Sequence, residues 1–244
     1  QTTSSTTFTH SAQTTSTLNP GFESLGVGLF CWLVTASTGY EPALVQEHFR
    51  EQRSLFRCDD ASVFTDAPML LWPVPSTSIG ALDSKMAPWG SWANTGVFLR
   101  AWDALVKEGK YAKRAWTVKV DADTVFFPSR LLAHALDQGW HGAEPVFVTN
   151  LGAYVGPIEV LSAAAVRTFE ALRAPACDHF VANSGEDGFL NSCLGALNIT
   201  MRQDGSLLLS TKFPGDCGVP SYVAFHPFKT FSDYAACLGN ATVP

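Results

Sequence analysis

Two aspartates follow an apolar segment that is typical of a buried β-strand. Residues 116–120, WTVKV, alternate toward one face, which predicts a strand that ends just before Asp121 and Asp123. Ligands of open α/β sheets bind where strands end, so carboxylates at this place are candidates for metal or phosphate chemistry. Both side chains can reach one cation where the backbone turns from the strand into a loop.

A divalent metal is the partner that these carboxylates favour, although a plain loop turn uses the same residue types. Mg²⁺ and Mn²⁺ prefer oxygen ligands and leave positions open for substrate phosphates. The chain has a formal net charge of −6 and a pI near 5.4. This charge argues against a nucleic-acid partner, which requires a basic face. A phosphate bound to such an acidic protein would need a cation between the two.

A second pair of acids stands at the start of a predicted helix. In SGEDGFL, residues 184–190, Ser184 and Asp187 have the spacing of a capping box, and Glu186 and Asp187 suit the positive end of a helix dipole. This structural role is sufficient to explain both acids. A cap also fixes a carboxylate in space, however, and a fixed carboxylate in a cleft can accept a proton.

A late histidine is the third candidate. His226 lies in VAFHPFK, residues 223–229, between Phe225 and Pro227, where histidine is more often a packed residue than a ligand. The other histidines have still less context, and they are His10, His48, His134, His141 and His179.

The aspartate segment also matches a phosphatase signature. DADTV, residues 121–125, satisfies the short motif of the haloacid-dehalogenase phosphatases. That family requires a further acidic pair on a GDxxxD-like loop, whereas GDCGVP at 215–220 has no second acid. A phosphatase is therefore the less favoured interpretation.

Several features indicate the secretory pathway. Residues 1–24 begin with a Ser/Thr-rich segment that has almost no apolar material, which predicts a stalk or linker, open to O-glycosylation. Asn198 and Asn240 begin N-x-[ST] sequons. The cysteines are even in number and lack the CxxC spacing of zinc sites, so disulfides explain them better than reduced thiols in a cytosolic protein. They are Cys31, Cys58, Cys177, Cys193, Cys217 and Cys237.

No stretch of the sequence predicts a membrane span. The longest apolar run, LGVGLFCWLVTA at 25–36, is about half the length that crosses a bilayer, and it predicts a buried strand. No signal peptide or anchor is recognisable, but a chain that begins at Gln1 is compatible with a trimmed product. We expect membrane attachment only through a segment beyond this sequence, and the sequence indicates no oligomeric state.

Residues 25–244 alternate strand and helix patterns in the way of a single α/β domain. This order predicts a mostly parallel central sheet that is covered by helices on both faces. Prolines and glycines at 73–88 predict a long irregular loop. Strands are expected at 29–35, 61–66, 69–74, 116–120 and 145–150, and helices at 43–56, 93–110, 129–139, 158–172 and 184–197.

Taken together, these segments resemble the GT-A-fold glycosyltransferases, in particular the core 1 β1,3-galactosyltransferase (T-synthase) and Fringe-like family. The resemblance covers most of the chain after the stalk. Order and approximate spacing both agree, which makes the set more specific than any single motif. The segments are LFCWLVTA with the following Arg57-Cys58, AWTVKVDADTV, GPIEVLSAAAVRTF, SGEDGFLNSCLGALNI and AFHPFK.

The resemblance implies a Rossmann-like GT-A fold and a role for each acid. Asp123, assisted by Asp121, would hold Mn²⁺ or Mg²⁺ against the diphosphate of a UDP-sugar, and His226 would complete the coordination. Asp187 would take the proton from the acceptor hydroxyl, with Glu186 orienting the site. The implied activity is inverting transfer of a galactose-like hexose to a glycan or glycoprotein, in the Golgi lumen or outside the cell.

The same resemblance implies that Cys31 pairs with Cys58. It pairs Cys193 with either Cys177 or Cys217, and spacing does not decide between them. Three tryptophans in or beside the irregular loop are candidates to stack on a sugar, although aromatic residues near prolines more often pack locally. They are Trp72, Trp89 and Trp92.

A function of another class fits the same sequence. A secreted, non-catalytic glycosyltransferase-like domain would act as a lectin or as a structural glycoprotein, with the Ser/Thr-rich segment as a glycosylated spacer. The presence of both aspartates, the acid pair and the histidine favours the enzyme, because a module that only binds has no evident need for a base.

Overall fold

The computed structural model describes residues 28–88, 90, 92–151, 156–183 and 185–242. The predicted stalk at 1–24 lies outside the described residues, as do Trp89 and Ser184.

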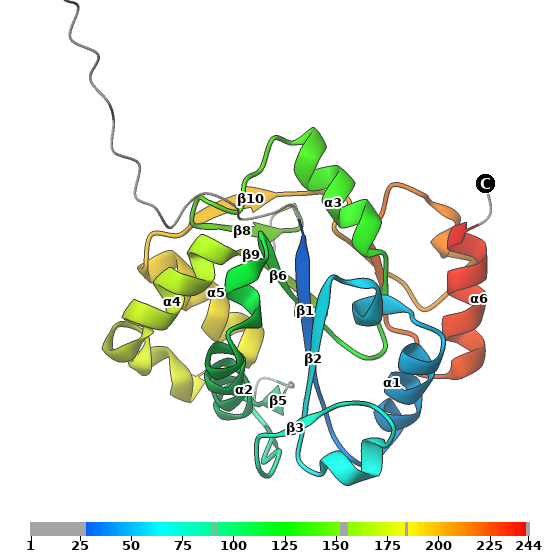
Figure 1. Cartoon of the computed structure of the whole chain (residues 1–244), viewed down its shortest axis with the longest axis horizontal. Helices are drawn as coiled ribbons and strands as arrows, with labels where there is room; N and C mark the ends of the chain where they lie inside the picture. The colour runs from blue at the N-terminus through cyan, green and yellow to red at the C-terminus, as the bar shows by residue number, and fades with distance from the viewer. Residues whose placement is uncertain (1–27, 89, 91, 152–155, 184, 243–244) are drawn as a thin grey trace, which may run out of the picture.

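The centre of the described chain is a mixed sheet of seven strands. These are β1 (Leu29–Thr35), β2 (Asp60–Thr65), β3 (Thr77–Ser78), β6 (Trp116–Val120), β8 (Val146–Thr149), β9 (Ile158–Ser162) and β10 (Thr200–Gln203). Their spatial order is β10-β8-β9-β6-β1-β2-β3 (Figure 1). Only β9 runs antiparallel to its neighbours in this sheet. The predicted α/β class with a mostly parallel central sheet is confirmed.

Helices cover both faces of this sheet, as Figure 1 shows. α2 (Thr95–Glu108), α4 (Ala163–Ala176) and α5 (Glu186–Ala196) lie on one side. α1 (Glu41–Arg50), α3 (Pro128–Asp137) and α6 (Phe231–Thr242) lie on the other. Among the described residues, no helix has both the length and the apolarity to cross a membrane.

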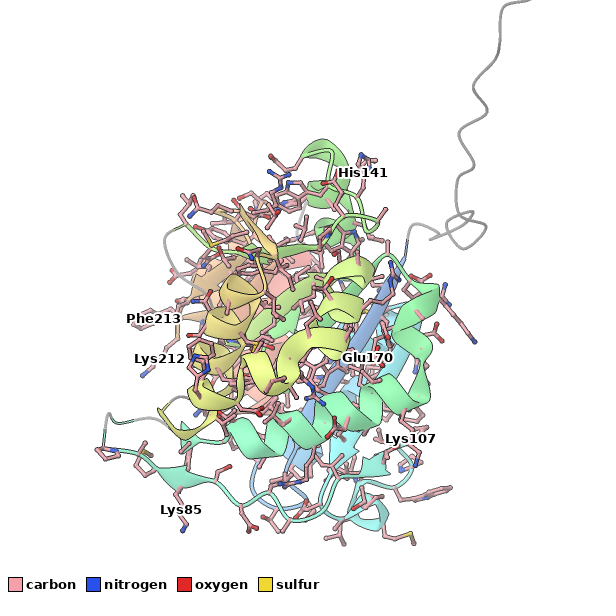
Figure 2. All side chains as sticks on the ribbon, turned by 90° about the vertical axis from the view of Figure 1, so that its left-hand side faces the viewer. Lys85, Lys107, His141, Glu170, Lys212 and Phe213 are labelled. Atoms are coloured by element: carbon pink, nitrogen blue, oxygen red, sulfur yellow. A yellow bond between two sulfur atoms is a disulfide. The ribbon has the colours of Figure 1, made fainter. Side chains whose placement is uncertain are left out.

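The alternating side chains of β1 explain why a helix layer packs on each face of the sheet. Leu29 and Cys31 belong to the buried cluster that includes Val45 of α1, whereas Phe30 and Trp32 belong to the cluster on the opposite face. Side chains of successive strand residues point to opposite faces, so an all-apolar strand supplies two cores. Figure 2 views the layer of α2, α4 and α5 from outside, where the exposed side chains include Lys107 of α2 and Glu170 of α4.

Smaller elements complete the fold. A second sheet has three strands in the order β11-β12-β7, and a two-stranded ribbon pairs β4 with β5. Their bounds are β7 (Val125–Phe126), β11 (Leu208–Ser210), β12 (Ala224–His226), β4 (Lys85–Met86) and β5 (Trp92–Ala93). The 3₁₀ turns are η1 (Ser54–Arg57), η2 (Pro68–Leu71), η3 (Lys110–Lys113), η4 (Asp178–Asn183) and η5 (Pro214–Gly218).

Most of the predicted elements are present, with shifts at their ends. α2 ends where predicted, because Gly109 adopts the left-handed conformation (φ 68°) that favours glycine after a helix. The confirmed strands are those predicted at 29–35, 61–66, 116–120 and 145–150, and the confirmed helices are those at 93–110, 129–139 and 184–197.

The predicted helix at 158–172 is wrong in its first part, which forms strand β9. Ile158 and Val160 are buried in one core and Leu161 in the other, so these residues fit a strand between two layers better than a one-sided helix. Ser162 then ends the strand and caps α4, since its hydroxyl accepts the N–H of Ala165 at 3.0 Å.

The predicted strand at 69–74 is also wrong. This segment contains η2 and a chain that leaves most of its apolar side chains in solvent, with Met69 85% and Trp72 77% exposed. Pro68 precedes the stretch and Pro73 lies within it, and both lack the N–H group that a sheet ladder requires. The edge strand β3 forms further along, at Thr77–Ser78.

The predicted helix at 43–56 is interrupted. α1 ends at Arg50, and Gln52 and Ser54 have positive φ angles of 49° and 50°. Left-handed residues cannot continue the hydrogen-bond ladder of a right-handed helix, so the chain turns and forms η1.

All six cysteines form disulfides. Cys31 bonds to Cys58, in agreement with the resemblance, and the open alternative for Cys193 is decided in favour of Cys177. Cys217 bonds to Cys237, which ties η5 to α6.

Replacing Cys31 and Cys58 together by alanine should lower the free energy of unfolding. The bond joins residues 27 positions apart, and closing a loop of that size in the unfolded chain stabilises the folded state. We expect a loss of about 3.5 kcal/mol, measured by urea unfolding. An unchanged midpoint at an unchanged m-value would show that this bridge contributes nothing to stability.

Candidate active site

The turn after β6 brings the two aspartates of the DAD segment together. β6 ends at Val120, and the N–H of Asp121 donates to the carbonyl of Pro157 at 3.0 Å, which prolongs the pairing with the chain before β9. The N–H of Thr124 then donates back to the carbonyl of Asp121 at 3.1 Å and closes a turn. The strand-to-loop turn expected from the sequence is thus present.

His226 reaches this turn through the small sheet. β12 pairs with β7, which directly follows the aspartates, and the N–H of Phe228 donates to the carbonyl of Asp123 at 2.9 Å. The imidazole Nε2 of His226 lies 3.3 Å from Asp123 Oδ1. Asp121, Asp123 and His226 each offer one ligand atom, and these atoms all lie within 4.8 Å of one another.

Asp123 is held as a carboxylate. Burial raises the pKa of its carboxyl, but the hydrogen bond and charge of His226, together with the bond from Tyr40, outweigh burial and keep the pKa below its usual value. The hydroxyl of Tyr40 donates to Asp123 Oδ2 at 3.1 Å. An ionised carboxylate is the form that binds a metal.

The residues fit a divalent ion. Two carboxylates and one imidazole form a set of oxygen and nitrogen donors that Mn²⁺ accepts, and Mg²⁺ shares the preference for the oxygens. This small set leaves coordination positions for phosphate oxygens of a substrate.

Lys119 is a central residue that the sequence analysis missed. Its side chain is 1% exposed and its ammonium Nζ lies 2.7 Å from Asp121 Oδ1 and 3.1 Å from Glu186 Oε1. Nζ also donates to the carbonyl of Gly156 at 2.7 Å, so each of its three donors has a partner. Burial lowers the pKa of Lys119, but the charges of Asp121 and Glu186 outweigh it, so the pKa lies well above the usual value.

A sequence signal for Lys119 did exist. Lysine is almost never fully buried unless it is paired, and this lysine interrupts an otherwise apolar strand, two positions before Asp121. Residues two apart on a strand share a face, which predicts contact with the first aspartate. The contact with Glu186, which lies 67 residues away in sequence, has no local signal.

Glu159 is a second missed group. It lies opposite Lys119 in the pairing of β6 with β9 and is 1% exposed. Burial raises the pKa of its carboxyl well above the usual value, although the charge of Lys119 acts in the opposite direction. Its Oε1 has no hydrogen-bond partner among the described residues. Burial therefore favours the uncharged form of Glu159, and the ammonium of Lys119 is bound by Asp121 and Glu186 instead.

The acid pair stands at the start of α5, but its cap differs from the predicted one. The N-cap residue is Gly185, and the side chain of Asn94 caps the helix by accepting the N–H of Glu186 at 2.9 Å. Asp187 Oδ1 accepts the N–H of Gly188 at 2.7 Å. Burial raises the pKa of Glu186, yet the charge of Lys119 outweighs it and holds the pKa below its usual value.

One pocket joins the two groups of acids. A cavity of about 280 Å³ lies between the end of β6 and the start of α5. Gly156 forms part of its wall, and a Cβ atom there would lie 3.3 Å from the carboxylate of Asp187, so a glycine leaves this acid room. Asp123 and His226 do not line this pocket, but their ligand atoms lie within 4.8 Å of that of Asp121, which does. The lining residues are Trp92, Asn94, Asp121, Gly156, Pro157, Gly185, Glu186 and Asp187.

The two described tryptophans of the irregular loop line different cavities, and both sequon asparagines are exposed. Trp92 lines this pocket and is 54% exposed, whereas Trp72 lines a separate groove beside α1. The glycosylation candidates Asn198 and Asn240 are both exposed, and the amide of Asn240 donates to the carbonyl of Pro214 at 2.9 Å.

Comparison with known proteins gives likenesses in structure but none in sequence. No family model matches the sequence, and no curated protein matches it. Among solved structures, the chain is similar to the crystal structure of a glycosyltransferase involved in the glycosylation of the major capsid of PBCV-1, with a TM-score of 0.44 and 10% sequence identity. The match covers 85% of this chain and 98% of that chain. A likeness at this level does not indicate a shared activity, so the function has to be inferred from the residues of the site.

Replacing Lys119 by methionine should destabilise the protein, because it leaves Asp121 and Glu186 without their buried cation. We expect the free energy of unfolding to fall by about 3–5 kcal/mol, the usual cost of breaking a buried ion pair from one side. Lys110→Met is the matched control, since that lysine forms a half-exposed pair with Glu108 at 3.2 Å. The control should cost no more than about 1 kcal/mol.

Denaturant unfolding of both lysine variants measures this difference in the free energy of unfolding. Adding Glu186→Gln to Lys119→Met should recover part of the loss, because it removes one of the uncompensated charges. Equal unfolding free energies for the two lysine variants would contradict a central role for Lys119.

Proposed function

We propose that this chain is a metal-dependent, inverting glycosyltransferase of the GT-A class that moves a hexose from a UDP-sugar to a hydroxyl group on a glycan or glycoprotein. The observation that carries the proposal is that Asp121 and Asp187, from distant parts of the sequence, line one pocket, and that the ligand atoms of Asp123 and His226 lie within 4.8 Å of that of Asp121. The resemblance of the sequence motifs to the T-synthase and Fringe-like family supports the same activity.

Each residue of the metal group has a separate task in this proposal. Asp123 and His226 would hold Mn²⁺ or Mg²⁺, and Asp121, anchored by Lys119, would assist them. A bound cation would stabilise the negative charge that grows on the diphosphate leaving group. Tyr40 donates to Asp123 Oδ2 and so fixes which oxygen of that carboxylate is turned to His226.

Asp187 would be the general base. Its Oδ1 accepts the backbone N–H of Gly188, and its Oδ2 lies beside Gly156 at the pocket wall. The carboxylate would take the proton of the acceptor hydroxyl while the new bond forms between that oxygen and the anomeric carbon and the bond to the diphosphate breaks. One displacement from the face opposite the leaving group inverts the anomeric configuration.

Glu186 is suited to orientation rather than proton transfer. Its carboxylate is bound by the ammonium of Lys119 at 3.1 Å, and its backbone N–H is bound by Asn94 at 2.9 Å. Both contacts fix the start of α5, and therefore the position of the next residue, Asp187. The charge of Lys119 also lowers the pKa of Glu186, so its carboxylate is a weaker base than an unperturbed one.

The cysteines and the sequons support a cellular compartment for the chain. Three disulfides and two exposed sequons support an oxidising environment, and we assign the chain to the Golgi lumen or the extracellular space. A nucleotide sugar and a glycan or glycoprotein acceptor are the partners that this activity requires.

Metal-dependent donor binding is the first test. Calorimetry should detect UDP-sugar binding in Mn²⁺ and lose it in a chelator. Asp123→Asn should weaken that binding by more than about 100-fold while the melting temperature is kept, because a ligand is lost rather than a core group. Asp137→Asn, an exposed carboxylate at the end of α3, is the matched control and should bind normally. Absence of metal-dependent nucleotide binding in the unaltered protein would favour the lectin or structural alternative.

Loss of the base is the second test. Asp187→Asn should reduce kcat by about 10³-fold with the affinity for the donor unchanged, since a general base contributes to the chemical step and not to donor binding. Steady-state kinetics with a glycan acceptor, together with donor calorimetry, separates the two effects. Near-normal turnover in this variant would remove Asp187 from the role of base.

A further inference from the structure

His48 of α1 contacts the backbone of the turn that carries Asp121 and Asp123. Its side chain is 1% exposed, and its Nε2 lies 2.8 Å from the carbonyl oxygen of Ala122, the residue between the two aspartates. A carbonyl oxygen can only accept, so the imidazole donates its Nε2–H. The two residues are 74 positions apart in sequence.

This contact completes a set of bonds to consecutive carbonyls. The carbonyl of Asp121 accepts from the N–H of Thr124, and the carbonyl of Asp123 accepts from the N–H of Phe228. Between them, the carbonyl of Ala122 has the side chain of His48 as its partner. The hydroxyl of Tyr234 reaches the next carbonyl, that of Thr124, at 3.4 Å, which is long for a hydrogen bond.

The surroundings keep His48 neutral and leave one of its nitrogens unused. Burial lowers the pKa of His48 to about 4, and the charge of Arg53 adds to this against the hydrogen bond to Ala122. Nδ1 is buried and has no hydrogen-bond partner among the described residues. A buried polar atom without a partner costs stability, and an aromatic or aliphatic side chain would fill the space without that cost. The Nε2–H is therefore what distinguishes histidine at this position.

We propose that His48 is a positioning residue for the metal group, which fixes the peptide between Ala122 and Asp123 and thereby the direction of the Asp123 carboxylate. Rotation of that peptide changes the backbone φ of Asp123, and so moves its carboxylate away from His226. The inference rests on the proposed metal role of Asp123, and it adds a residue outside the acidic pocket to the machinery.

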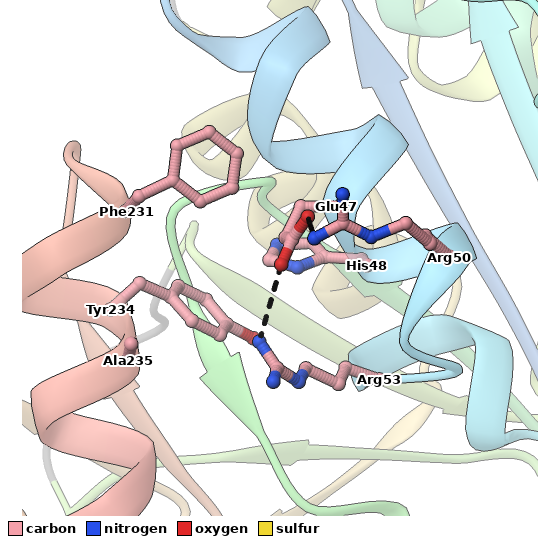
Figure 3. A pocket seen from close by; sticks show the side chains of 7 residues that line it. All are labelled: Glu47, His48, Arg50, Arg53, Phe231, Tyr234 and Ala235. Carbon is pink, nitrogen blue, oxygen red and sulfur yellow. Dashed lines mark ion pairs between the residues drawn. The ribbon is translucent and has the colours of Figure 1, made fainter.

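His48 lies outside the pocket of Asp187, so it can be replaced without changing a residue that lines that pocket. It lines a separate cavity of about 480 Å³. Figure 3 shows this cavity between α1 and α6. Glu47 of this cavity pairs with Arg50 and, at 4.0 Å, with Arg53. The ring of His48 packs on that of Tyr234 with centroids 4.4 Å apart. None of the residues that line this cavity lines the pocket of Asp187.

The test compares two variants of His48 with a matched control. His48→Phe keeps the ring contact and loses the N–H, whereas His48→Gln keeps an amide donor. We expect His48→Phe to weaken Mn²⁺ binding by about 10–100-fold, as for other residues that orient a metal ligand, and His48→Gln to recover part of it. Tyr234→Phe removes the weaker carbonyl contact of the same cluster and should leave Mn²⁺ affinity within about threefold, because a 3.4 Å contact contributes little.

The readout is Mn²⁺ affinity of the full chain, measured by electron paramagnetic resonance, with the melting temperature recorded for each protein. A folded His48→Phe protein that binds Mn²⁺ as tightly as the unaltered chain would overturn the proposal, as would equal losses in the phenylalanine and glutamine variants. A kcat that falls in parallel with Mn²⁺ occupancy and returns at saturating Mn²⁺ is the expected kinetic result. A merely structural role would lower the melting temperature without this metal dependence.

A measurement on the unaltered protein covers the case in which the variants do not fold. Long-range ¹H–¹⁵N correlation of the histidine rings should show one buried imidazole with the proton on Nε2 at neutral pH and slow exchange with solvent. A proton on Nδ1 instead would overturn the proposal. Mn²⁺ binding without any sugar transfer would remove the proposed function alone and leave the role of His48 open to the same comparison.

Discussion

The buried ammonium of Lys119 is the interaction on which the arrangement of the site depends. It joins a carboxylate at the end of β6, a carboxylate at the start of α5 and a backbone carbonyl before β9. In the low dielectric of the interior these charges would repel each other strongly without a cation, and an unpaired ammonium would be equally costly. Because all three partners are present together, the two groups of acids are fixed at one distance. Burial raises the pKa of Glu159 beside them, which disfavours a further negative charge in the interior.

The topology explains why residues so far apart in sequence meet there. The parallel strands β1 and β6 end at the same edge of the sheet, and the antiparallel β9 begins at that edge, so Gly156 and Pro157 lie beside the end of β6. The small sheet of β7, β11 and β12 then returns His226 to the turn that holds Asp123. An acidic pocket with one internal lysine retains net negative charge, which suits a bound cation and, through it, an anionic donor.

Hydrophobic alternation and helix-end signals were sufficient to predict the α/β class, the strand before the aspartates and the end of α2 at Gly109, because each is encoded within a few adjacent residues. The sequence of β9 predicts a helix because an alanine-rich helix follows it without a break. Residues 69–74 have the apolar pattern of a strand, but Pro68 before them and Pro73 within them do not fit a sheet ladder. The acids and His226 were visible as motifs. Lys119 and His48 were not assigned, since the contacts that give them their roles are 67 and 74 residues distant in sequence. The burial of His48 follows from the folded state and not from neighbouring residues, whereas the apolar strand around Lys119 indicates that this lysine is buried.

The central claim is that the Asp-Ala-Asp turn, His226 and Asp187 form a single site for a metal and a nucleotide sugar. Diffraction from crystals soaked with UDP and MnCl₂, recorded at a wavelength where manganese scatters anomalously, tests it most directly. The account predicts one manganese peak bound by Asp123 and His226, with the diphosphate reaching toward the pocket that Asp187 lines. Manganese bound elsewhere, or a nucleotide that lies away from this pocket, would contradict it.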